Sequence, residues 1–247
     1  MIQVMFVGSV ASGKTSTARA LKKILGDGGF LVKYVDVNVN HGFAYIITRF
    51  IASLLRYKYV GNYYLTIRFN NEAFFCKYLR LMQILDILYI PIKYFTGLKF
   101  FIFFNRLRKK RIVILLDEYY LNSIIDYLYF SKGLCRYLYK MNEDRMSTCK
   151  LFYSLAFRLL LLSLKKDRTL IIHLSRIFDE SVKGWRLRER TYLVDESHIL
   201  FRSLATKVIL DNLKRYVGDN VQFKSYLVQD FTKTSECIIK DVLDFMR

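Results

Sequence analysis

The apolar positions of this chain fall into short continuous runs that alternate with longer stretches of helical periodicity. Runs of about four to eight apolar residues are typical of strands buried on both faces of a parallel sheet. The predicted strands cover residues 2–7, 30–37, 111–116, 169–174 and 221–228. Apolar spacings of three and four predict helices at residues 14–25, 44–55, 72–89, 121–129, 147–164, 198–216 and 234–246. This alternation predicts an α/β fold, a doubly wound parallel sheet of about five strands flanked by helices.

A single domain is expected for the 247 residues, because one proline and scattered glycines leave no linker and no internal repeat is visible. Residues 38–111 are long for a crossover and rich in Tyr and Phe. They end in a basic cluster made of Arg106, Arg108, Lys109, Lys110 and Arg111. We interpret this segment as a helical insertion that builds either a substrate site or the face of a homodimer.

The chain is strongly basic, with 40 Lys and Arg against 21 Asp and Glu and a formal charge of +19. An anionic partner is therefore expected: a nucleotide, a nucleic acid or an acidic membrane surface. The four cysteines are widely spaced and only three histidines are present, so no metal-ligand pattern is visible and reduced thiols are expected. Charged residues interrupt the apolar stretch 81–104, and residues 2–7 read as a strand rather than a signal peptide. These features predict a cytoplasmic protein.

A phosphate-loop motif follows the first predicted strand and opens the first predicted helix, which is expected to end at Gly26. The motif G-x-x-x-x-G-K-[ST] is matched by Gly8-Ser9-Val10-Ala11-Ser12-Gly13-Lys14-Thr15, with Ser16 after it. In such loops backbone N–H groups wrap the phosphates, so Lys14 is expected to reach the β and γ oxygens and Thr15 to hold Mg²⁺. The alternative is an ordinary glycine turn, but the strand and helix on either side favour a site for ATP with Mg²⁺.

Asp117 follows the apolar run of residues 112–116, at the carboxyl end of a predicted central strand. Open α/β sheets bind their ligands at this edge, and a carboxylate there can hold the magnesium ion of a bound nucleotide. Asp117 could instead cap the helix that begins near Leu121. The phosphate loop favours the metal role, because its chemistry needs a carboxylate.

Arg186 and Arg190 lie four residues apart after the strand at residues 169–174, so they share one helix face. Planar guanidinium groups bind phosphate oxygens in two places, and phosphoryl transfer develops charge on such oxygens. Residues 183–196 are therefore a candidate lid. A solvated basic helix is the alternative, and the arginine spacing alone would favour it.

The order of these segments resembles the thymidylate-kinase-like branch of the P-loop nucleoside and nucleotide kinases over nearly the whole chain. In that family a strand ends in Asp-Arg-Tyr, which is similar to Asp117-Glu118-Tyr119-Tyr120-Leu121-Asn122-Ser123. The family's lid arginines fall on Arg186, Arg188 and Arg190, and its last helix begins at a segment similar to Thr234-Ser235-Glu236. The resemblance implies ATP-dependent phosphoryl transfer to a nucleotide or nucleoside.

The same resemblance implies an acceptor site, where the chain departs from the family. Arg80 and Gln83 match the helix that contacts the acceptor base, and Asp36 ends the second strand, where related nucleoside kinases carry a base. Asp36 could equally cap the following turn. Glu118 replaces an arginine that helps to hold the acceptor's phosphate, which a carboxylate cannot do. Two further departures are Val10-Ala11 in place of Asp-Gly, and Asp36-Val37-Asn38-Val39-Asn40 in place of Arg-Glu-Pro-Gly.

Two other classes of function fit parts of the sequence. The string Leu115-Leu116-Asp117-Glu118 also resembles the Walker B pair of P-loop ATPases, in which the glutamate activates water. No Leu-Ser-Gly-Gly-like signature precedes it, and no second domain is visible for a motor to act on. A basic, nucleic-acid-associated or membrane-surface NTP-binding protein is the third class, supported by aromatic residues among Lys and Arg at residues 56–58 and 100–111.

Overall fold

A computed structural model describes residues 1–9, 11–36, 42–59, 63–94, 101–102, 111–117, 121, 125, 129, 154–155, 157–165, 167–189 and 196–246. Within these residues, five strands form one parallel sheet in the order β2-β3-β1-β4-β5. Their bounds are β1 Ile2–Gly8, β2 Leu31–Asp36, β3 Ile112–Asp117, β4 Arg168–Ser175 and β5 Val221–Leu227. The predicted doubly wound α/β fold is confirmed, because the strand order reverses on either side of β1.

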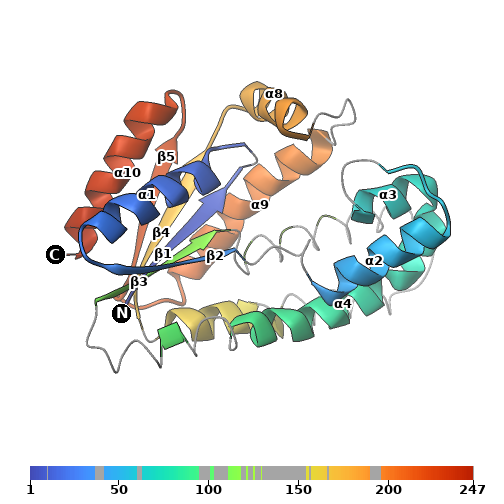
Figure 1. Ribbon diagram of the computed structural model, residues 1–247, viewed down its shortest axis with the longest axis horizontal. Coiled ribbons are helices and arrows are strands. Elements are labelled where there is room, and N and C mark those ends of the chain that lie inside the picture. The colour runs from blue at the N-terminus through green and yellow to red at the C-terminus, as the bar shows by residue number, and fades with distance from the viewer. Residues whose placement is uncertain are drawn as a thin grey trace.

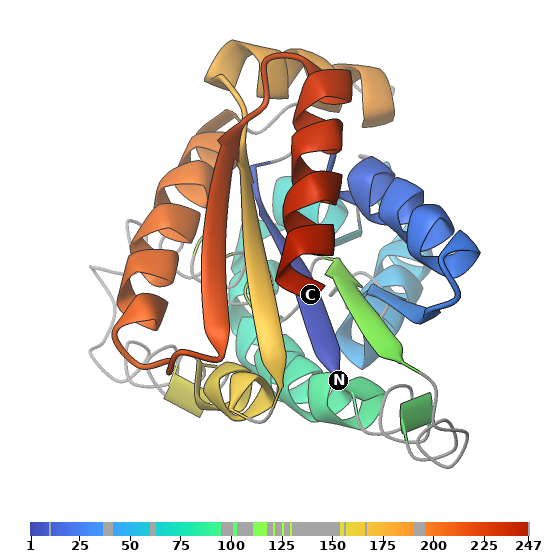
Figure 2. The ribbon, with the colours of Figure 1, turned by 90° about the vertical axis from the view of Figure 1, so that its left-hand side faces the viewer.

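Apolar residues cover both faces of the sheet at β1 and β3, which explains why these two strands read as continuous hydrophobic runs. In β1, Val4 and Phe6 belong to one core cluster, whereas Met5 and Val7 belong to the other. The first cluster is completed by helices α1 Lys14–Asp27 and α10 Phe231–Met246. The second cluster is completed by α9 Glu196–Lys214 and by helices that lie between residues 43 and 94. Figures 1 and 2 show α1 and α10 on one side of the sheet and α9 on the other.

Helices within residues 38–111 pack on one another beside the sheet (Figure 1). They are α2 Phe43–Leu54, α3 Tyr63–Asn70 and α4 Glu72–Tyr94. Thr48 of α2 contacts the sulfur of Met82 in α4, and Tyr64 of α3 donates to the Asp86 carboxylate in α4 at 3.3 Å. These stretches are helical, and the prediction that residues 38–111 form an insertion that builds an acceptor site or a dimer face stays a prediction. Within the described stretches, no helix is both long and apolar enough to cross a bilayer.

The strand and helix ends lie close to the predicted ones, with three differences. Helix α1 continues through Gly26 to Asp27, so the prediction that Gly26 ends it is wrong. Gly29, at φ 80°, is the left-handed residue that follows the helix. Helix α4 runs through Pro91 to Tyr94. Helix α3 was not predicted, because aromatic and β-branched residues disfavour helices and its stability comes from burial of Tyr64 and Ile67.

Two predicted helices, at 121–129 and 147–164, fall partly outside the described residues. Of the first, only residues 121, 125 and 129 are described, and all three are helical. Of the second, the described residues from 157 to 164 are helical.

Candidate functional site

The loop between β1 and α1 has a backbone that only particular residues can adopt. Gly8 has φ 136°, Ala11 φ 55° and Gly13 φ 85°, all in the region that favours glycine. A Cβ on Gly8 would lie 1.9 Å from the Leu174 carbonyl oxygen. The loop therefore crosses β4 at a distance that excludes side chains, and the Ser9 N–H donates to the same carbonyl at 3.0 Å.

Lys14 lies at the start of α1 with its ammonium group folded back under the loop. Its side chain is buried, and Nζ donates to the Ser9 carbonyl oxygen at 2.7 Å and to that of Gly8 at 3.3 Å. The hydroxyl of Ser12 donates to the same Ser9 oxygen at 2.8 Å. The loop thus curls around a positive charge at the amino end of a helix, where backbone N–H groups and the helix dipole also favour an anion.

Thr15 and Asp117 meet beside this loop, from α1 and from the end of β3. The Thr15 hydroxyl donates to Oδ2 of Asp117 at 2.6 Å, and the hydroxyl of Tyr34 in β2 donates to the same oxygen at 2.8 Å. Asp117 is buried, and Oδ1 has no hydrogen-bond partner among the described residues. A buried carboxylate oxygen beside a threonine hydroxyl is a donor pair that suits Mg²⁺, so these residues fit the ion that a phosphate-loop site implies.

Arg176, just beyond β4, ties the loop to the helix that follows. Its N–H donates to the Ser9 hydroxyl at 3.0 Å and its guanidinium donates to the Ala11 carbonyl at 3.0 Å. The same guanidinium pairs with Glu180 at 3.3 Å. Ala11 has a left-handed backbone, so this bond supports the loop at a conformation that costs energy.

Helix α8, Phe178–Glu189, lies across the carboxyl edge of the sheet and against the loop (Figures 1 and 2). A Cβ on Gly184 would lie 2.6 Å from the Cβ of Ala11, so glycine permits this close approach. Arg186 of this helix is exposed and pairs with Glu196 of α9 at 3.3 Å. A segment predicted as a lid is thus helical up to Glu189 and touches the phosphate loop through Gly184.

Helix α10 borders the loop on its other side. A Cβ on Gly13 would lie 2.5 Å from the ring of Phe231, so that ring packs on the loop backbone. The hydroxyls of Thr17 and Ser235 lie 3.4 Å apart between α1 and α10. Asp230 caps α10 by accepting from the backbone N–H groups of Thr232 and Lys233.

His173 of β4 carries the clearest electrostatic effect near the loop. Burial lowers its pKa from the ordinary value of 6.5, and the positive charge of Lys14 lowers it further. Lys214 acts in the same direction, and Asp211 opposes it. A neutral imidazole is therefore expected under the loop at neutral pH.

The structure brings some of the predicted site residues together and not others. The described loop residues, Thr15 and Asp117 meet at the carboxyl edge of the sheet, Ser16 is exposed in the first turn of α1, and Arg186 pairs with Glu196. The backbone of Asp36 is paired in register with Asp117, and Arg80 and Gln83 lie in α4. The side chains of these last three residues and of Arg188, as well as Val10, Glu118 and Arg190, lie outside the described residues.

Sequence reasoning missed Tyr34, Arg176 and Phe231. Tyr34 lies in the second strand, two residues before its end, and its ring reaches the Asp117 carboxylate from there. Arg176 directly follows β4, and Phe231 begins α10. The only signal for them is that residues near the carboxyl ends of parallel strands converge on one edge of the sheet, which does not identify the partner of each side chain.

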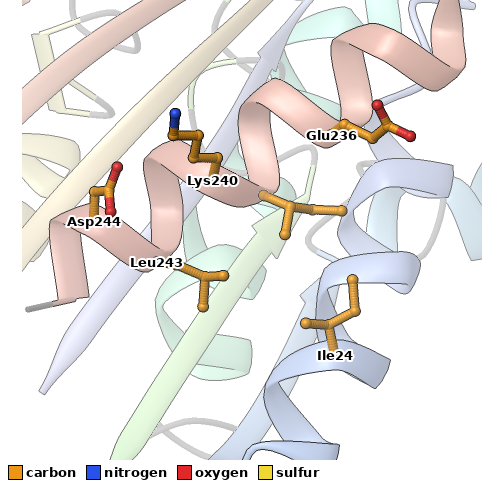
Figure 3. A pocket seen from close by; sticks show the side chains of 6 residues that line it. Ile24, Glu236, Lys240, Leu243 and Asp244 are labelled. Atoms are coloured by element: carbon orange, nitrogen blue, oxygen red, sulfur yellow. The ribbon is translucent and has the colours of Figure 1, made fainter.

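A shallow apolar groove of about 490 Å³ lies between α1 and α10, away from this edge. Figure 3 shows Ile24 of α1 facing Leu243 and its neighbours on α10. Ile24 is ten residues beyond Lys14, about 15 Å along the helix. The groove is therefore separate from the phosphate loop.

No protein-family model and no curated protein matches this sequence. Solved structures do match. One is deoxyadenosine kinase from M. mycoides with bound dCTP, with TM-score 0.57, 16% identity and 98% of each chain covered. The same enzyme with bound dATP gives TM-score 0.58 and 14% identity over 98% of this chain and 99% of that one. Thymidylate kinase from Candida albicans gives TM-score 0.52 and 12% identity over 98% of this chain and 91% of that one.

These matches span nearly the whole length of every chain compared, including the helices of residues 38–111. At such low identity the likeness shows the fold. The expected fold, that of the thymidylate-kinase-like P-loop kinases, is confirmed.

Proposed function

We propose that this chain, which has the fold of the thymidylate-kinase-like P-loop kinases, transfers the γ-phosphoryl group of ATP to a nucleotide or nucleoside. The observation that carries this proposal is the Thr15–Asp117 pair beside the phosphate loop. The loop offers N–H donors and the Lys14 ammonium to phosphates, while Thr15 and Asp117 offer oxygen atoms to Mg²⁺. These are the parts that phosphoryl transfer requires of a protein, which has to position and neutralise rather than react covalently.

Each residue of the donor site has a distinct task in this proposal. Lys14 exchanges its loop carbonyl partners for the β and γ oxygens of ATP. Thr15 and Asp117 hold Mg²⁺, which neutralises charge on the phosphates when it is bound. Arg186 and Arg190 approach the transferred group from α8 and the segment after it. In this structure Arg186 instead forms an exposed ion pair with Glu196. Arg186 has to break this pair to reach the phosphates, which costs little because exposed ion pairs contribute little stability.

The acceptor is proposed to bind between the carboxyl edge of the sheet and helices α2 to α4. Asp36 lies beside Asp117 in the strand register, close to where an acceptor hydroxyl would meet the γ-phosphate. Arg80 and Gln83 of α4 are proposed contacts to the acceptor base, and Glu118 is a proposed contact to the acceptor. The deoxyadenosine kinase structures contain dATP and dCTP, which makes deoxynucleosides the first acceptors to test.

An acceptor panel tests this function. The purified protein is incubated with γ-labelled ATP, Mg²⁺ and single nucleosides or nucleoside monophosphates, and the products are separated by chromatography. The proposal predicts label in one class of nucleotide product, and its loss in the Lys14→Ala variant. Release of free phosphate without any labelled nucleotide would instead favour a P-loop ATPase that uses Asp117 and Glu118.

A further inference from the structure

Tyr34 makes a contact that the donor site described above leaves unexplained. In the strand register Tyr34 is paired with Leu115, two residues before Asp117 on the same face of the sheet. Two residues of strand span about 6.6 Å. The long phenol ring covers this distance along the sheet and donates to Asp117 Oδ2 at 2.8 Å.

The two carboxylate oxygens of Asp117 therefore differ in their hydrogen bonding. Oδ2 accepts from both Thr15 and Tyr34, whereas Oδ1 is buried without a hydrogen-bond partner among the described residues. Two donors on one oxygen fix the rotation of the carboxylate and therefore the direction of the other oxygen. The Thr15 hydroxyl can bind the ion through a lone pair and still donate its proton, but its position then depends on the ion, whereas Tyr34 holds Oδ2 without being a ligand.

We propose that Tyr34 is a positioning residue for the magnesium site, which holds Asp117 so that Oδ1 faces the ion. This inference rests on the proposed function. In the proposed site Tyr34 does not contact the phosphates of ATP. Its phenol hydroxyl is therefore expected to contribute to metal affinity and not to the affinity for metal-free nucleotide. Partners that orient a metal ligand typically contribute about 10- to 100-fold in metal affinity.

The test replaces the hydroxyl alone, with Tyr34→Phe. Mn²⁺ serves as the metal probe, and its binding to the protein with a non-hydrolysable ATP analogue is followed by electron paramagnetic resonance. Affinity for the analogue in EDTA is measured separately. Tyr226→Phe is the matched control, because Tyr226 of β5 also donates to a carboxylate, that of Asp241 in α10, outside the site.

The inference predicts that Tyr34→Phe weakens Mn²⁺ binding about 10- to 100-fold, while affinity in EDTA is unchanged and Tyr226→Phe behaves as wild type. Mn²⁺ affinity within about twofold of wild type would overturn it, and so would an equal loss of affinity in EDTA. Wild-type protein that binds no nucleotide at all would contradict the proposed function, and the inference would fall with it.

A double-mutant cycle separates positioning from a general effect on folding. If Tyr34 acts through Asp117, Tyr34→Phe changes Mn²⁺ affinity in the wild type but not in the Asp117→Asn background. Equal effects in both backgrounds would mean that Tyr34 acts elsewhere and would overturn the inference.

Discussion

Thr15 Oγ1 donates a hydrogen bond of 2.6 Å to Asp117 Oδ2, although 102 residues separate the two along the chain. The strand register brings them together, because β3 is paired directly with β1 and both end at the same edge of the sheet. The carboxylate of Asp117 is thereby engaged with α1 and, through Tyr34, with β2.

Replacing Asp117 by Asn should weaken the dependence of activity on Mg²⁺. The amide keeps the shape of the carboxylate but removes its charge and one acceptor oxygen. Loss of a group that only orients a metal ligand typically costs about 10- to 100-fold in metal affinity, and loss of the ligand's own charge should cost at least as much, so the Mg²⁺ concentration for half-maximal activity should rise by at least roughly 10-fold. An Mg²⁺ titration at saturating ATP measures this, with the exposed Asp219→Asn as control. An unchanged titration would leave Asp117 with a structural role.

Replacing Lys14 by Ala should abolish ATP binding or turnover while the fold is kept. Loss of one partner from a buried charge pair costs about 2–5 kcal/mol, and Lys14 is buried with its ammonium under the loop. Calorimetric titration with MgATP measures the affinity, and circular dichroism checks the fold. Lys22→Ala, on the exposed side of α1, should bind as wild type. Activity of Lys14→Ala equal to that of the wild type would contradict the assignment of this loop to the ATP site.

Arg176→Met should lower ATP affinity through the loop conformation. The change removes the guanidinium bond to the Ala11 carbonyl but keeps the backbone N–H bond to Ser9. One such bond contributes about 0.5–1.5 kcal/mol, so the KM for ATP should rise roughly 2- to 10-fold. Lys183→Met is matched, because Lys183 is exposed and pairs with the same Glu180. If both variants raise KM alike, the effect comes from Glu180 and not from the loop.

Much of this architecture could be predicted from the sequence, because continuous apolar runs have few alternatives to buried strands. The phosphate loop was predictable from its motif, because its glycines answer local backbone demands, such as the positive φ of Gly8 and Gly13. Tyr34 and Arg176 could not be predicted in this way. Their bonds join residues 83 and 165 positions away, so they depend on which strands are neighbours and in what register.

The imidazole of His173 should make the protein less stable in acid. Its pKa is lowered in the folded state, so below pH 6.5 the unfolded chain binds a proton that the folded chain resists. Stability is therefore lost as the pH falls from 6.5 toward the lowered pKa. Denaturant unfolding at pH 7.5 and at pH 5.5 should show a smaller difference for His173→Asn than for wild type. An equal difference would place the acid sensitivity in other groups.

The fate of the γ-phosphate tests the proposed function most directly. Wild-type protein is mixed with γ-labelled ATP, Mg²⁺ and the acceptor selected from the panel, and ADP, labelled nucleotide and free phosphate are quantified in one time course. Phosphoryl transfer predicts one labelled nucleotide for each ADP formed, little free phosphate, and no ADP when the acceptor is omitted. ADP and free phosphate formed in equal amounts at the same rate with or without acceptor would contradict the kinase function.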